Sequence, residues 1–183
     1  MNRLRQQVSR LIVAGLLSIG SMSLVASDSA SDSPSGRAAV VGLWSGGDSL
    51  LEVKPTADDS LSMVVLALQN PRYLPDEGKG QPGQTRLDDN NPQPALRQRP
   101  ILGLELLSEY RFDGRRWQGS IYDPESGNSY SSRMERDGAR LKMRGYIGVP
   151  MLGRTQYFQR VERCDETVLT MLTESEVDDA FCD

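Results

Sequence analysis

The stretch from Ile101 to Val161 constrains the fold most, because short β-rich segments alternate there with turn signals at nearly regular intervals. Three of the turns contain a glycine, Gly114, Gly127 or Gly138, at a position where a left-handed backbone conformation is often needed. Residues 148–150 (Gly-Val-Pro) provide a fourth turn. This spacing predicts a ladder of antiparallel hairpins.

Two segments of the ladder alternate apolar and polar residues, as expected for strands with one dry and one wet face. Residues 115–122 place Trp117, Gly119 and Ile121 on one face. Residues 139–147 repeat the pattern, with an apolar series of Leu141, Met143, Gly145 and Ile147. A glycine in such a series indicates a sharp bend or room for a large neighbour. We expect the apolar face to form the core.

Eight strands are predicted along the chain, near residues 39–45, 49–54, 61–68, 101–108, 115–122, 128–136, 139–147 and 152–161. Eight antiparallel strands joined by hairpins can remove their exposed edges by closing into a barrel. The sequence therefore predicts an all-β protein, with one eight-stranded up-and-down barrel over residues 38–163. A barrel of this size is either filled by side chains or holds one small ligand.

The N-terminus has the pattern of a secretory signal peptide, with three arginines before an apolar run that ends in Leu24-Val25-Ala26. We expect cleavage after Ala26, a disordered Ser- and Asp-rich spacer over residues 27–37, and a periplasmic or secreted protein without stable membrane insertion. An uncleaved membrane anchor is the alternative. The run is short for a membrane span, which needs about 20 apolar residues.

The net charge and the residue composition limit which classes of partner and which types of reaction are expected for this chain. The net charge is −4, and signal cleavage would make it more negative, which argues against nucleic acid or an anionic membrane as partner of the whole chain but allows a local basic patch. The chain has no histidine, and neither a phosphate-binding glycine loop nor a serine-nucleophile elbow is found. We expect no enzyme, no metal and no cofactor.

Two alternatives to this expectation remain. A hydrolase could use two facing carboxylates, drawn from Glu105, Glu109, Asp123 and Glu125. Residues 88–91 (Asp-Asp-Asn-Asn) offer oxygens to calcium, although they lack the spacing of a calcium loop and read more simply as a turn.

The C-terminal tail, residues 164–183, contains both cysteines of the chain. In an oxidising compartment, Cys164 and Cys182 are expected to form a disulfide, with two free thiols as the alternative. Between them, Asp165 can cap a short helix. The apolar stripe of that helix would be formed by Val168, Leu169, Met171 and Leu172.

The long segment from Gln69 to Pro100 lacks periodicity, and loops of this length in a compact domain are usually functional or disordered. Arg97 and Arg99 could hold a carboxylate or phosphate together, or pair with local acids. Trp117, Tyr130 and Tyr146 are candidates for an aromatic pocket. The alternative is that these aromatic residues are core and cross-strand partners.

Gly42-Leu43-Trp44 in the first strand, with Arg160 in the last, resembles the lipocalin signature in which an arginine packs over the tryptophan and closes the barrel. Three longer blocks, at residues 89–103, 117–130 and 141–161, resemble the bacterial exported family catalogued as domain of unknown function 2147. The resemblance covers residues 40–161. It implies a lipocalin-like barrel with a small ligand, and it marks Asn91, Arg97, Arg99, Tyr122 and Asp123 as family positions without an assigned role.

The sequence thus favours an exported lipocalin-like protein that binds a small, largely apolar molecule in or at the mouth of its barrel. The expected ligand contacts are Trp117, Tyr130, Tyr146, Asn91, Arg97 and Arg99. The expected structural residues are Gly42, Trp44, Tyr122, Asp123 and Arg160. The alternative is a cell-envelope interaction module without a ligand cavity, with an unknown protein partner.

Overall fold

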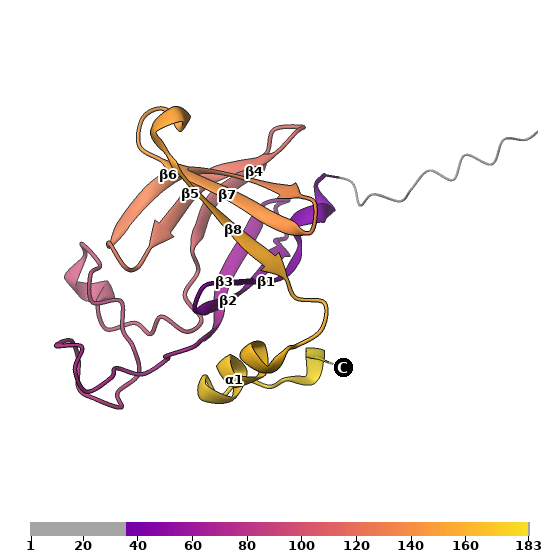
Figure 1. Cartoon of the computed structure of the whole chain (residues 1–183). Helices are drawn as coiled ribbons and strands as arrows, with labels where there is room; N and C mark the ends of the chain where they lie inside the picture. The colour runs from indigo at the N-terminus through magenta and orange to yellow at the C-terminus, as the bar shows by residue number, and fades with distance from the viewer. Residues whose placement is uncertain (1–35, 183) are drawn as a thin grey trace, which may run out of the picture. The chain divides into compact units, whose positions relative to one another are not determined.

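Eight antiparallel strands form a nearly closed barrel in the computed structural model, which describes residues 36–182 (Figure 1). The strands are β1 (Gly42–Gly46), β2 (Ser49–Pro55), β3 (Leu61–Leu68), β4 (Leu107–Phe112), β5 (Trp117–Asp123), β6 (Asn128–Asp137), β7 (Arg140–Tyr146) and β8 (Arg154–Arg160). Their order is β3-β2-β1-β8-β7-β6-β5-β4, which confirms the predicted up-and-down barrel. The expected signal peptide and residues 27–35 of the expected spacer lie outside the described residues.

Five short helices complete the described chain. They are the 3₁₀ turns η1 (Ala38–Val40), η2 (Pro94–Leu96), η3 (Pro150–Leu152) and η4 (Ala180–Cys182), and the α-helix α1 (Glu166–Glu174). Within residues 36–182, none of these helices has the length and hydrophobicity needed to cross a membrane.

The first and last strands meet at Trp44 and Arg160, which are direct partners in the antiparallel register. The guanidinium carbon of Arg160 lies 5.3 Å from the centroid of the Trp44 ring, and Arg160 Nη1 donates to the Val41 carbonyl over 2.8 Å. Gly42 makes room for this contact, because a Cβ there would lie 2.9 Å from the guanidinium and its φ is +131°. The Gly-x-Trp spacing therefore has a steric cause.

The barrel closes on its other side through an irregular segment, and here one predicted strand is wrong. The regular strand β4 begins at Leu107, not at residue 101. Before it, Gly103 has a φ of +79°, and residues 103–106 make backbone hydrogen bonds to β3 outside a regular ladder. Glu105 then offers its carboxylate to β3, where Met63 N donates to Oε1 over 2.9 Å and the Ser62 hydroxyl donates to Oε2. The Glu105 carboxylate thus accepts a hydrogen bond from β3 that a backbone carbonyl would accept in a regular ladder.

Large side chains from all eight strands fill the interior. The fully or nearly buried members of this core are Trp44, Leu51, Val53, Met63, Val65, Leu107, Tyr110, Trp117, Met134, Leu141, Met143 and Phe158. Gly119 provides the space that its place in the apolar series predicted, because a Cβ there would lie 2.6 Å from the Tyr110 ring. Tyr110 shares a 2.8 Å hydrogen bond with Ser132, and burial raises the pKa of its phenol. The interior is a packed core.

Helix α1 covers a second apolar cluster formed with β2 and β3. Asp165 caps the helix as predicted, accepting from Val168 N over 2.9 Å. The buried residues of the cluster are Val168, Met171, Leu172, Leu50 and Ala67. Leu169 was expected in the same stripe but is 39% exposed.

The tail is bonded through Cys164 and Cys182, which are 18 positions apart in the sequence. We expect the double substitution of Cys164→Ser and Cys182→Ser to lower the free energy of unfolding by about 3 kcal/mol, because the bond restricts the unfolded chain. Urea denaturation checks this. The wild type in reducing agent should match the variant, and an unchanged midpoint in both would contradict it.

Candidate functional site

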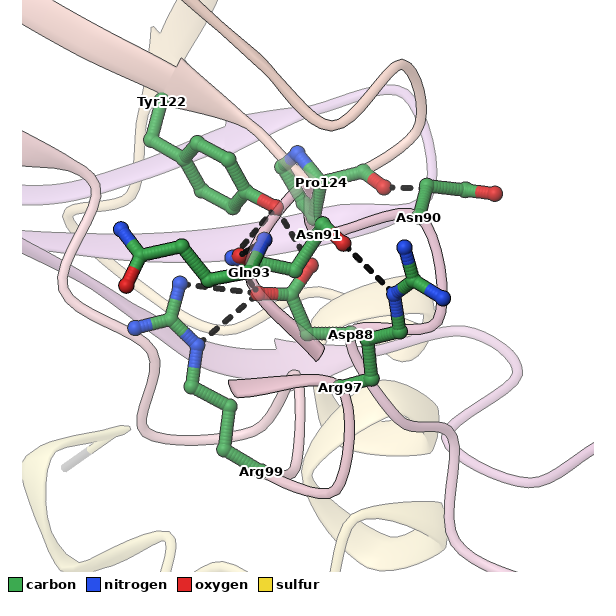
Figure 2. A network of polar contacts seen from close by, with 8 residues as sticks. All are labelled: Asp88, Asn90, Asn91, Gln93, Arg97, Arg99, Tyr122 and Pro124. Carbon is green, nitrogen blue, oxygen red and sulfur yellow. Dashed lines mark hydrogen bonds and ion pairs between the residues drawn. The ribbon is translucent and has the colours of Figure 1, made fainter. Parts of the chain in front are cut away.

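The buried carboxylate of Asp88 is the centre of a polar network that organises the long loop between β3 and β4 (Figure 2). Arg99 donates to Asp88 Oδ2 from Nε over 2.8 Å and pairs with it through Nη2 at 2.8 Å. Asn91 Nδ2 donates to the same oxygen over 2.8 Å, and the Tyr122 hydroxyl donates to Oδ1 over 2.6 Å. Each oxygen of Asp88 therefore has a donor, as a buried charge requires.

Tyr122 links this loop to the barrel, since it lies on β5. Burial and the hydrogen bond to Asp88 both raise the pKa of its phenol, so the hydroxyl remains a donor at neutral pH. The guanidinium of Arg99 lies 5.4 Å from the Tyr122 ring centroid. The positive charge of Arg99 and the negative charge of Asp88 cancel, and Tyr122 adds a neutral donor. Together these hydrogen bonds stabilise the loop against β5.

A second contact holds the loop against the β5–β6 turn. Asn90 Nδ2 donates to the carbonyls of Pro124 and Glu125 over 3.1 and 2.8 Å. Gly127 in that turn must be a glycine, because its φ is +71° and a Cβ would lie 1.9 Å from the Asn90 carbonyl oxygen. Asp123 orders the turn by accepting from Glu125 N and the Ser126 hydroxyl.

Arg97 and Arg99 do not converge on a common position (Figure 2). Arg97 donates through Nε to the Asn91 carbonyl over 2.7 Å, whereas Arg99 faces Asp88. Pairing with a local acid, the alternative considered for these arginines, describes Arg99. A ligand contact of Arg97 or Asn91 stays a prediction.

The three aromatic candidates are also separated. Trp117 is buried at the start of β5, where its Nε1 donates to the Arg37 carbonyl over 3.2 Å. Tyr130 is paired with Ile121, nearer the other end of β5, and it belongs to the inward series that includes Ser132. Tyr146 belongs with Lys142 and Arg144 on the other face of its strand. The three rings therefore do not form one wall.

A surface pocket lies beside Trp117, at the barrel end near η1. Its volume is about 220 Å³. Its apolar lining comes from Ala38, Val41, Pro55, Leu61 and Trp117, and its polar lining from Arg37, Asp59 and Ser60. Apart from Trp117, sequence reasoning missed these residues, because they come from η1 and the β2–β3 turn and share no motif.

Three of the carboxylates considered for catalysis and calcium binding, those of Glu105, Asp123 and Asp88, have partners within the chain. Glu105 accepts from β3, Asp123 accepts within its turn, and three donors surround Asp88. Among residues 36–182, no three histidine, cysteine or acidic side chains are grouped closely enough to hold a metal ion.

Comparison with known proteins agrees with this geometry. Residues 42–160 match the model of a family described as an uncharacterized protein conserved in bacteria (DUF2147). Among solved structures, protein HP1028 from Helicobacter pylori, described as belonging to the lipocalin family, is 19% identical with a TM-score of 0.52, and the match covers 72% of this chain and 97% of that one. This likeness shows a lipocalin-like fold. No significant match was found among curated proteins.

Proposed function

The chain belongs to the bacterial family DUF2147, and from its lipocalin-like barrel we propose that it is an exported protein that binds a small, largely apolar group at one end of the barrel, beside Trp117. The observation that carries this proposal is the apolar pocket between η1 and the β2–β3 turn. The packed interior argues against a ligand held in the middle of the barrel.

The size of the pocket limits its ligand. Drug-sized ligands occupy pockets of about 300–1,000 Å³, while an apolar cavity of about 150 Å³ can hold benzene. A pocket of about 220 Å³ is therefore suited to one aromatic ring or the end of a short acyl chain.

The rim of the pocket suggests a polar end on that ligand. Arg37 and Asp59 both line the pocket and form an ion pair at 3.6 Å. Both side chains are largely exposed, so this pair contributes little to stability and can exchange partners at small cost. A short amphiphile with a carboxylate or hydroxyl could place its polar end there.

Calorimetric titration with hexanoate and benzyl alcohol tests the proposal. We expect Ala38→Phe to weaken binding by at least about tenfold, because the new ring would occupy the pocket. Leu74→Phe, an exposed change in the long loop, is the matched control and should bind as the wild type does.

Native mass spectrometry of the protein purified from its own cell envelope provides a second readout. An apolar molecule should copurify with the wild type and be lost from the Ala38→Phe variant. Absence of a copurified molecule together with no binding of either probe would contradict the proposal.

A cell-envelope interaction module is the second candidate, favoured by the packed interior and by the Asp88 network that orders the long loop. A photo-crosslinker at exposed Gln98 should then capture one protein repeatedly from intact cells. The same crosslinker at exposed Ser129 should not.

A further inference from the structure

The loop between β7 and β8, residues 147–153, extends beyond the ends of the two strands and contains the short turn η3 (Figure 1). Ile147, Val149, Met151 and Leu152 are 75%, 55%, 88% and 81% exposed, the most extensive such group among the described residues. Single exposed apolar residues are ordinary, but four in one loop mark an interaction surface. We name these four residues the apolar tip.

The loop that carries the apolar tip is held in place by hydrogen bonds, most of them from the Arg144 side chain. Arg144 donates from Nε to the Pro150 carbonyl over 2.7 Å, from Nη2 to the Met151 carbonyl over 3.0 Å, and from Nη1 to the Thr155 hydroxyl over 2.7 Å. The 3₁₀ turn η3 adds a bond from Gly153 N to the Pro150 carbonyl. The loop is therefore ordered with its side chains outward, and little further ordering would be needed on binding.

The charge around the tip is positive, although the whole chain is acidic. Residues 143–156, which are the loop and the adjoining ends of β7 and β8, contain two arginines, Arg144 and Arg154, and no carboxylate. Arg133 and Arg144 lie directly opposite each other on β6 and β7, an unfavourable pairing of like charges. Among residues 36–182, neither of these arginines nor the exposed Arg154 forms an ion pair. These cations complement an anionic partner.

We propose that the apolar tip inserts into the surface of a phospholipid bilayer, with Arg133 and Arg154 placed near lipid phosphates. A convex apolar loop with arginines behind it suits the boundary between acyl chains and headgroups. Tyr146, which is at the base of the loop with Arg133 5.7 Å from its ring, is a residue type typical of that boundary. The acidic remainder of the chain would stay away from the bilayer. This proposal is independent of the pocket beside Trp117.

Flotation with vesicles tests the proposal on the full chain after signal removal. We expect binding to vesicles of phosphatidylethanolamine and phosphatidylglycerol, and weaker binding to phosphatidylcholine alone. The double substitution of Met151→Asp and Leu152→Asp should weaken the vesicle affinity by at least about tenfold. The matched control, Leu74→Asp with Leu169→Asp, adds the same charge at other exposed apolar positions and should bind as the wild type does.

The variant Met151→Trp reports insertion directly. Its emission should shift to the blue on vesicles and be quenched by lipids brominated in the acyl chain, while the native Trp44 and Trp117 are buried and should respond little. Equal weakening in the control, no binding by the wild type, or no shift in the tryptophan variant would overturn the proposal. Concentration-dependent dimerisation in sedimentation, abolished by the Met151 and Leu152 substitutions, would assign the tip to a second copy and overturn it as well.

Discussion

Trp44→Ala is expected to lower the free energy of unfolding by about 3–5 kcal/mol, the usual cost of removing a buried aromatic side chain. Trp44 is fully buried, and the guanidinium groups of Arg160 and Arg136 lie 5.3 and 5.2 Å from its ring. Its Nε1 also donates to the Val40 carbonyl over 2.8 Å. The substitution would therefore remove core volume, two cation–ring contacts and the hydrogen bond to η1 at the same time.

Urea denaturation followed by circular dichroism measures this effect. Trp44→Phe is the matched control, since it keeps most of the volume and one aromatic face, and it should lose clearly less stability than Trp44→Ala. A loss below about 1 kcal/mol for Trp44→Ala would show that Trp44 does not hold the barrel closed.

Asp88→Ala is expected to cost about 3 kcal/mol, because it leaves Arg99, Asn91 and Tyr122 without their common acceptor. The cost for a completely buried pair can be higher, but the Arg99 side chain is 35% exposed and water can screen part of its charge. Hydrogen exchange should show where the loss occurs. We expect Asp88→Ala to increase the exchange rate, relative to the wild type, more in the loop at residues 87–100 than in β6 and β7.

Arg97→Ala is the control for this prediction. Arg97 is exposed and, within the described part of the chain, its side chain makes one hydrogen bond, to the Asn91 carbonyl. Its removal should cost about 1 kcal/mol. Equal costs at Asp88 and Arg97 would contradict the assignment of Asp88 as the centre of the network.

The hairpin ladder was predictable because local signals determine it. The turn glycines at 114, 127, 138 and 148 all have positive φ values, and the alternation in β5 and β7 follows the core. Ile147, predicted as the last apolar residue of the seventh strand, is the exception, because it lies beyond β7 and is exposed. The pairing of Trp44 with Arg160 was also predictable, from the lipocalin signature. The Asp165 cap and the disulfide followed from the spacing of residues in the tail.

Other features depend on contacts between distant segments, which a single sequence does not reveal. The start of β4 at Leu107 depends on how Glu105 pairs with β3. The packed interior depends on how side chains of all strands fit together, so alternation alone could not distinguish it from an open lumen. Asp88 lay in a polar run that resembled a turn, and its burial against Tyr122 follows only from the folded loop.

An iodobenzene soak of crystals of the protein tests the central claim, a filled barrel with its binding pocket at one end, because anomalous scattering locates the iodine without ambiguity. We expect iodine beside Trp117 and Leu61, in the pocket near η1. Iodine between Met63 and Met134 inside the barrel, or no bound iodine at all, would contradict it.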